Sequence, residues 1–208
     1  MNLTLISDTH GFHDGLDLSS GEVLLHTGDV SSRGSLQEVE SFLNWFARQN
    51  FEHKIFIAGN HDFFFESANA DAIQQLIPEG VTYLNDSGIT INDVHFWGSP
   101  VQPRFFDWAF NKDRGADIDQ HWQLIPDDVD VLLTHGPPHG ILDRTVGDQE
   151  VGCEMLRKKI REIKPQLSVF GHIHEGYGMR ELEETTFVNA SVLDHRYRLV
   201  NDPVILEL

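Results

Sequence analysis

Side chains that commonly bind metal ions follow the apolar runs of this chain. They are Asp8 and His10 in SDTH, Asp29 in TGDV, Asn60 and His61 in AGNHD, His135 in THGPP, and His172 and His174 in VFGHIHEG. Imidazole, carboxylate and amide ligands without thiolate suit Mn, Fe, Zn or Co better than a structural, cysteine-rich zinc site. The residue types therefore indicate a transition-metal site.

Taken singly, each of these residues has another explanation. In a strand, alternate side chains share a face, so His172 and His174 could converge on one ion, or they could point two polar rings to solvent. Simple structural roles also exist for the remaining residues: turn capping by Asp8 or Asp29, a left-handed turn at Asn60, and a satisfied loop histidine at His135. One shared site is a more economical hypothesis than all of these explanations together.

The set contains too many ligands for a single ion. Two ions about 3.5 to 4 Å apart, joined by one carboxylate and by water, would use all of them. Such a pair lowers the pKa of the shared water and neutralises charge on a phosphoryl group, so hydroxide becomes available near neutral pH. The sequence thus predicts a two-metal hydrolytic site.

These side chains need elements that bring them to one place. Short runs of apolar and β-branched residues predict buried strands at 3–7, 22–27, 54–58, 131–134 and 167–170. Amphipathic segments predict helices at 35–50, where Ser35 and Glu38 have capping-box spacing, and at 150–164, before Pro165. The alternation is typical of the α/β class, in which sites form outside the carboxyl ends of the strands.

The segment 81–99 has a different pattern. Asn85-Asp86, with Gly88 close behind, and Asn92-Asp93 interrupt short alternating runs in the manner of hairpin turns. Further short strands are expected in 184–208. Some strands should therefore be antiparallel, and we expect mixed sheets rather than a purely parallel, doubly wound one.

Composition limits the class of protein. With 208 residues, 40% of them hydrophobic, the chain suffices for one domain over residues 1–208. No run approaches the roughly 20 apolar residues of a membrane span, and no signal-peptide pattern is present. A single cysteine, Cys153, excludes an internal disulfide, and a cytoplasmic location is expected. The net charge of −18 disfavours long nucleic acid as a partner, although acidity can also serve solubility alone.

The ordered series SDTH, GDV, GNHD, THG and GHIH, over residues 7–174, resembles the motif series of the calcineurin-like metallophosphoesterase superfamily. This resemblance implies a four-layer α/β/β/α sandwich of two mixed sheets flanked by helices. Carried over by position, it implies that Asp29 joins two metal ions. It assigns Asp8, His10 and His174 to one ion, and Asn60, His135 and His172 to the other. It also implies that His61 is the acid near the leaving group rather than a ligand.

Four further stretches, WGSPVQPRFFDWAFN, LTHGPPHGILD, VGCEML and VFGHIHEGYG, resemble the small subgroup of mammalian brain metallophosphoesterase-domain phosphodiesterases. Some members of that subgroup lack one histidine of the last motif, whereas this chain has both. The resemblance implies attack by metal-bound hydroxide on small phosphodiesters or cyclic nucleotides, with Mn preferred as the metal. Two different functions stay open: a phosphomonoesterase or protein phosphatase, and a metal- and nucleotide-binding module with weak hydrolysis. The sequence also leaves the oligomeric state open.

Several residues near the motifs have open roles. Asp62 is a candidate to orient the His61 ring, and His139 is a candidate to contact substrate. The aromatic runs at 61–66 and 104–108 could stack a nucleobase, although core packing or a subunit contact is the commoner use of such runs. Cys153 has no activating neighbours in sequence and is expected to be a packing residue.

Overall fold

Two β-sheets form the centre of the protein, which a computed structural model describes over residues 1–208. The first sheet contains β1 (Asn2–Ile6), β2 (Gly21–Thr27), β3 (Phe51–Ile57), β4 (Val81–Tyr83) and β13 (Val204–Glu207). The second contains β5 (Ser87–Ile91), β6 (Val94–Ser99), β9 (Val131–Thr134), β10 (Leu167–Phe170), β11 (Gly178–Leu182) and β12 (Thr185–Asn189). A separate ribbon consists of β7 (Gln102–Pro103) and β8 (Asn111–Lys112).

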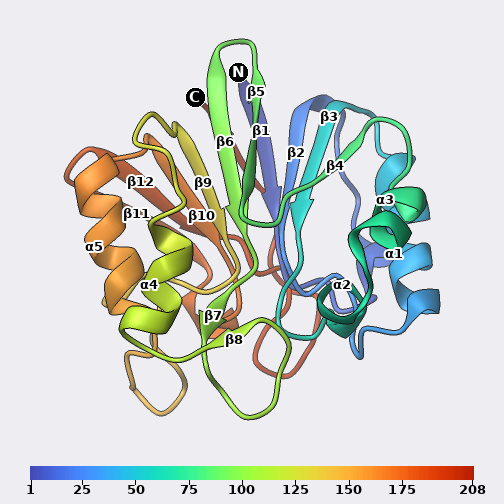
Figure 1. Cartoon of the computed structure of the whole chain (residues 1–208). Helices are drawn as coiled ribbons and strands as arrows, with labels where there is room; N and C mark the ends of the chain where they lie inside the picture. Colours follow the sequence, from blue (N-terminus) through green and yellow to red (C-terminus); the bar gives the residue numbers. More distant parts are fainter.

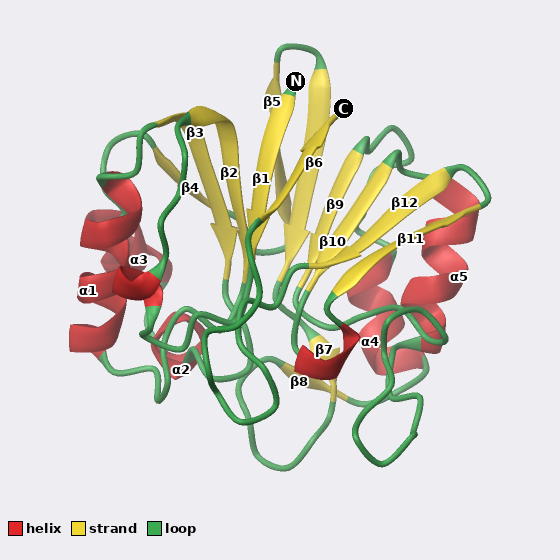
Figure 2. Cartoon of the chain, turned by 180° about the vertical axis from the view of Figure 1, so that it is seen from behind, coloured by secondary structure: helices red, strands yellow, loops and turns green.

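Helices cover the outer faces of both sheets (Figure 1 and Figure 2). The first sheet is covered by α1 (Leu36–Ala47), α2 (Phe63–Ser67) and α3 (Ala70–Leu76), and the second by α4 (Ala116–Trp122) and α5 (Glu154–Ile163). Two 3₁₀ helices, η1 (His13–Gly15) and η2 (His174–Gly176), follow β1 and β10. None of the helices combines the length and apolar character needed to cross a bilayer. The four layers confirm the predicted sandwich.

Both sheets are mixed, as the sequence indicated. In the first sheet, of order β13-β1-β2-β3-β4, only the β13 pair is antiparallel. In the second, of order β11-β12-β10-β9-β6-β5, the antiparallel pairs stand at the two edges. The parallel strands therefore end together, at the end of the molecule opposite to the two chain termini (Figure 1). The loops that leave these strand ends carry the side chains predicted to bind metal ions.

Three hydrophobic layers hold the sandwich together. Along β2, Val23 and Leu25 face the second sheet, whereas Leu24 packs with Phe42 and Phe46 of α1. This alternation follows from the period of two along a strand, and all of these side chains are buried. Because both faces of β2 are covered, its centre has three consecutive apolar residues, Val23, Leu24 and Leu25. A third layer lies between the second sheet and helices α4 and α5.

The two predicted helices are present with adjusted bounds. Ser35 caps α1: its hydroxyl accepts from the Glu38 N–H at 3.3 Å, and the Glu38 carboxylate accepts from the Ser35 N–H at 3.0 Å. The capping box is therefore confirmed. Helix α5 begins later than predicted, with Cys153 as its N-cap, and the buried Cys153 thiol accepts from the Trp122 indole at 3.4 Å. Cys153 is thus a packing residue, as predicted.

One of the two predicted hairpin turns is wrong. Asn92-Asp93 does join β5 and β6 as an antiparallel hairpin, with φ of 50° and 63° as a type I′ turn requires. Asn85-Asp86 instead lies where the chain crosses from β4 in the first sheet to β5 in the second. The Asp86 carboxylate there accepts from the Ser99 hydroxyl and pairs with the His121 ring, both at 2.6 Å. The turn-forming residues at this position therefore lie in a connection between the two sheets and not in a hairpin.

Gly98 of β6 allows the two sheets to approach closely, because an added Cβ would lie 2.6 Å from Ile57 Cγ2 and from Leu84 Cβ. Gly98→Ala is expected to lower the free energy of unfolding by about 1–3 kcal/mol, since this interface has no room for a methyl group. Urea unfolding measures the change. Gly147→Ala is the control: its Cβ would lie 3.7 Å from the nearest atom, in an exposed turn, and a change within about 0.5 kcal/mol is expected. Equal losses in the two variants would contradict this packing argument.

Candidate metal centre

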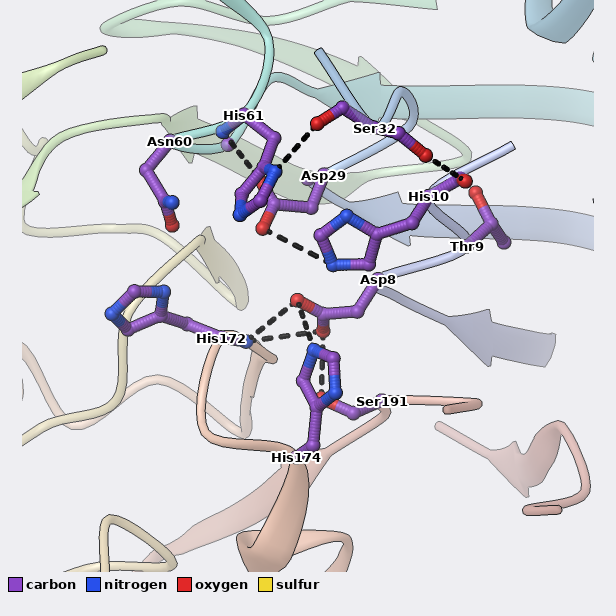
Figure 3. A network of polar contacts seen from close by, with 12 residues as sticks. Asp8, Thr9, His10, Asp29, Ser32, Asn60, His61, His172, His174 and Ser191 are labelled. Carbon is purple, nitrogen blue, oxygen red and sulfur yellow. Dashed lines mark hydrogen bonds and ion pairs between the residues drawn. The ribbon is translucent and has the colours of Figure 1, made fainter. Parts of the chain in front are cut away.

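The strand ends bring all eight sequence-predicted side chains to one place. The three groups of side chains whose ligand atoms lie within 4.8 Å of one another are Asp8, His10 and His174; His10, Asp29 and His61; and Asp29, His135 and His172. The groups overlap at His10 and Asp29, so they form one continuous cluster (Figure 3). Asn60 joins it, because its Oδ1 lies 2.9 Å from His135 Nε2. Residues from both sheets thus contribute to a single centre.

Asp29 lies between two histidines of different sheets. Its Oδ2 is 3.5 Å from His10 Nε2 and 3.4 Å from His135 Nε2. Asp8 has a similar partner in His174, whose Nε2 lies 3.5 Å from Asp8 Oδ1. The first and third groups correspond to the two ion sites that the family resemblance implies. Which ion each side chain binds stays a prediction.

Backbone carbonyl groups orient three of the imidazole rings. Because a carbonyl oxygen only accepts, the Nδ1 atom facing it carries a hydrogen, and Nε2 is the ring nitrogen left to bind a metal ion or to exchange a proton. His61 donates from Nδ1 to the Ser32 carbonyl at 2.8 Å. The other two pairs are His135 Nδ1 with Thr27 O at 2.9 Å and His174 Nδ1 with Asp194 O at 3.0 Å. This arrangement is typical of metal-binding histidines, whose second nitrogen is fixed by an acceptor.

Two features of the buried atoms fit bound cations. Both ring nitrogens of His10 are buried without a hydrogen-bond partner, which costs about 1–3 kcal/mol per group unless something else satisfies them. His135 Nε2 and Asn60 Oδ1 also lie 2.9 Å apart. A proton on Nε2 makes this contact a hydrogen bond, and a metal ion held by both atoms would take the place of that proton. The nitrogen and oxygen donors suit two divalent transition-metal ions.

Charge in the metal-free centre is balanced by protons. Burial alone raises the pKa of Asp8 and Asp29, but the facing histidines outweigh it and hold both values well below the usual range. Burial lowers the pKa of His135 and His174, yet the same carboxylates raise both to about 9. For His172, burial lowers the pKa to about 3. Two carboxylates therefore face two imidazolium groups, which divalent ions can replace.

The backbone at the centre is strained. Asp8, His10, Asp29 and His172 have φ of 55°, 43°, 54° and 67°, in the left-handed region that non-glycine residues rarely adopt. Each such residue costs about 1–3 kcal/mol and persists only where its surroundings hold it. The surroundings are visible: the His172 N–H donates to both oxygens of the Asp8 carboxylate at 3.0 Å, and Ser191 Oγ donates to Asp8 Oδ2 at 2.6 Å. Asp8 thus ties β1 of the first sheet to the loop after β10 of the second.

Asp62 does not orient the His61 ring, so that hypothesis is wrong. Its carboxylate is fully buried and accepts from the N–H groups of Val30, Ser31 and Gly59 at 2.8–3.1 Å, and from the Ser31 hydroxyl at 2.6 Å. These donors belong to the loops that follow β2 and β3. Because the adjacent side chains of residues 61 and 62 point apart, Asp62 stabilises the loops rather than the ring.

A cavity of about 310 Å³ opens beside the centre. One wall consists of the predicted ligands His10, Asp29, Asn60, His172 and His174, together with His61. Beyond them the lining includes Pro103, Arg104, Phe105, Trp108, Arg114 and Tyr197. His139 is not among the lining residues; its ring lies 3.8 Å from Glu150, so the predicted substrate contact is not supported.

The aromatic runs divide between core and cavity. Phe65 is buried in the core, and Phe63 and Phe64 pack against the same layer, as the commoner interpretation predicts. In the second run, Phe105 lines the cavity and Trp108 stacks on His61 at 4.1 Å between ring centroids. The two runs therefore have different roles.

Sequence reasoning missed several contributors to the centre. Tyr197 lies with its ring 4.9 Å from the His10 ring and 5.4 Å from the His174 ring. Ser191 binds Asp8, and the carbonyl of Asp194 orients His174. All three follow the last motif, in a stretch without a metal-binding pattern. A carbonyl acceptor leaves no trace in residue type, so only the fold identifies it.

The layered fold and the His/Asp clusters at its strand ends define a metallophosphoesterase. Residues 1–176 match the family model for calcineurin-like phosphoesterases, and the chain belongs to this family. It is 42% identical over 226 residues to metallophosphoesterase domain-containing protein 1 of Homo sapiens and of Mus musculus. These alignments cover 98% of this chain and 69% of each relative.

Solved structures show the same fold at low sequence identity. Phosphopantetheinyl hydrolase of Mycobacterium tuberculosis superposes with a TM-score of 0.63 at 18% identity, covering 94% of this chain and 90% of that one. Another crystal structure superposes with a TM-score of 0.70 at 14% identity, covering 90% of this chain and 89% of its own. At this identity the likeness concerns the fold alone.

Metal binding is expected to release protons. Near neutral pH the rings of His135 and His174, with pKa values of about 9, each hold a second proton in the metal-free protein. A ring nitrogen must lose its proton to bind a metal ion, so loading the centre should release about two protons, and metal affinity should fall as pH is lowered. Calorimetric titration in buffers of different ionisation enthalpy measures the release. Uptake of metal without proton release would contradict the charge balance described above.

Asp29→Asn tests whether one carboxylate serves both ions. The substitution removes the charge between His10 and His135, so we expect both ions to be lost together, with affinity reduced by more than the roughly 10–100-fold that an outer-shell change costs. Elemental analysis after dialysis measures metal content. Asp14→Asn, at an exposed carboxylate, is the control and should keep full occupancy. Loss of a single ion, or none, from Asp29→Asn would contradict the joining role.

Proposed function

We propose that the protein is a dinuclear-metal-dependent phosphodiesterase that hydrolyses small phosphodiesters or cyclic nucleotides. The observation that carries the proposal is the extent of the cavity. It continues past the metal-binding wall to the apolar side chains of Pro103, Phe105 and Trp108. A phosphodiester has an organic group on each side of phosphorus, and this second region has room for the group that a monoester lacks.

We propose two divalent transition-metal ions as cofactors, from Mn, Fe, Zn or Co, with Mn preferred. When bound, such a pair supplies Lewis acidity, which lowers the pKa of water and neutralises charge on phosphoryl oxygens. Asp8, His10 and His174 would hold one ion, and Asn60, His135 and His172 the other. Asp29 would contact both, because its Oδ2 faces His10 and His135 at nearly equal distances.

His61 supplies the proton that the leaving oxygen needs. Its N–H on Nδ1 is committed to the Ser32 carbonyl, so only Nε2 can exchange a proton with a ligand in the cavity. The backbone N–H of His61 also donates to Asp29 Oδ1 at 2.8 Å. This hydrogen bond holds the main chain of His61 next to the centre. In the reaction, Nε2–H gives its proton to the departing alkoxide and the ring leaves the step neutral.

Charge favours a small substrate. The chain carries a net charge of −18, which repels a long polyanion. The balance of positive and negative charge is different inside the cavity. Arg104 and Arg114 line its far part, and each is paired with one carboxylate. A compact phosphate ester can enter this local environment without approaching the rest of the acidic surface.

A substrate panel tests the proposal. The metal-loaded protein should hydrolyse an acyclic phosphodiester and 2′,3′- or 3′,5′-cyclic nucleotides with kcat/KM about tenfold or more above a matched phosphomonoester, the discrimination that one apolar pocket provides. Turnover confined to the monoester would identify a phosphomonoesterase and contradict the proposal. Full metal content without turnover of any substrate would favour a binding module.

A further inference from the structure

We propose that Trp108 is a positioning residue for His61: its indole holds the imidazole in the orientation from which Nε2 reaches the leaving group. The inference rests on the proposed acid role of His61 and goes beyond it, since it assigns the acid's orientation to a residue outside every metal-binding motif. It gives the 104–110 loop a part in the reaction.

The His61 ring is constrained from three directions. The Trp108 indole stacks on it with centroids 4.1 Å apart and planes 24° apart. The His10 ring meets it edge-on at 4.5 Å and 82°. The Ser32 carbonyl accepts from Nδ1 at 2.8 Å, as Figure 3 shows. A ring with one face stacked, one contact at its edge and one nitrogen bound cannot turn about either side-chain torsion without breaking a contact.

Of these three contacts, Trp108 is the one made by a side chain outside the predicted ligand set. His10 belongs to two of the metal-binding groups, and Ser32 contributes through its backbone. The indole is half-buried and lines the cavity next to His61. The His61 ring covers one face of the indole, and the Phe63 ring lies 5.9 Å from the indole between centroids. In the 104–108 run, the exposed Phe105 remains available to stack a nucleobase.

The loop that carries Trp108 is fastened to the centre. The Ala109 N–H donates to the carbonyl of Asn60 at 3.1 Å, and Gln102 Nε2 donates to the Ala109 carbonyl at 2.7 Å. Asn111 closes the tip of the loop: its Oδ1 accepts from the Phe105 N–H at 3.2 Å and its Nδ2 donates to the Phe106 carbonyl at 2.9 Å. The indole is therefore placed by the backbone of the residue that precedes His61.

The test compares two phosphodiesters that differ in the leaving group. The alkoxide that leaves an alkyl ester is strongly basic and needs a proton donor. The nitrophenolate that leaves a nitrophenyl ester is weakly basic and can depart without one. Trp108→Ala should lower kcat on the alkyl ester by roughly 10–100-fold, the cost of a misplaced acid, and much less on the nitrophenyl ester. Trp108→Phe should recover most of the loss. Phe106→Ala is the matched control, because Phe106 is 75% exposed in the same loop and does not line the cavity.

A double-mutant cycle separates positioning from other roles. If Trp108 acts through His61, Trp108→Ala should add no further loss in a His61→Ala background. An equal loss in both backgrounds, or an equal loss on both esters, would overturn the proposal. A His61→Ala variant that keeps full alkyl-ester activity would refute the acid role itself, and is thus distinguishable from failure of the positioning role.

Two measurements do not depend on turnover. In the protein loaded with diamagnetic zinc, the stacked indole should shift the His61 imidazole C–H resonances upfield, and this shift should disappear in Trp108→Ala but persist in Phe106→Ala. Metal content should be unchanged in both variants, which shows that the centre is folded. An unshifted His61 signal in the wild-type protein would overturn the stacking on which the proposal rests.

Discussion

The structure depends on two carboxylates, Asp8 and Asp29, that are buried where the two sheets converge. Removing a charged group from water is costly unless opposite charge and hydrogen bonds replace the lost hydration. Here Asp8 accepts from the His172 backbone and from Ser191, and pairs with His174. The hydrogen bonds that compensate the charge of Asp8 also join loops of different sheets. The same contacts therefore stabilise the buried charge and connect the two sheets.

The hydrophobic layers make this burial possible. The central strands are covered on both faces, and parallel pairing collects their carboxyl ends at one side of the molecule. Directly after β1, β2 and β10 the chain changes direction through four residues with left-handed backbone conformation, Asp8, His10, Asp29 and His172. The resulting strain is held by the centre's own hydrogen bonds. A metal ion that binds there meets ligands already gathered, and the fold rather than the ion bears most of the ordering cost.

Much of this arrangement was predictable from the sequence, because buried strands, a capping box and metal-binding residue types follow periodic or local rules. The strands at β1, β2, β9 and β10 and the cap at Ser35 belong to this group. The errors concern choices among distant partners. Asn85-Asp86 has the composition of a hairpin turn but joins two sheets, and Asp62 is adjacent to His61 in sequence while serving other loops. Neither the Ser32 carbonyl nor the Trp108 stack has a sequence pattern, since both depend on where separate loops meet.

The loop between β7 and β8 has two unlike parts. Its base is bound to the Asn60 backbone, whereas its tip, with Phe105 and Phe106, is exposed. Residues at the tip can therefore be exchanged without displacing the side chains that line the deep wall of the cavity. A protein built this way can diversify in what it recognises while its reaction chemistry stays the same, because variation and catalysis occupy different ends of one short segment.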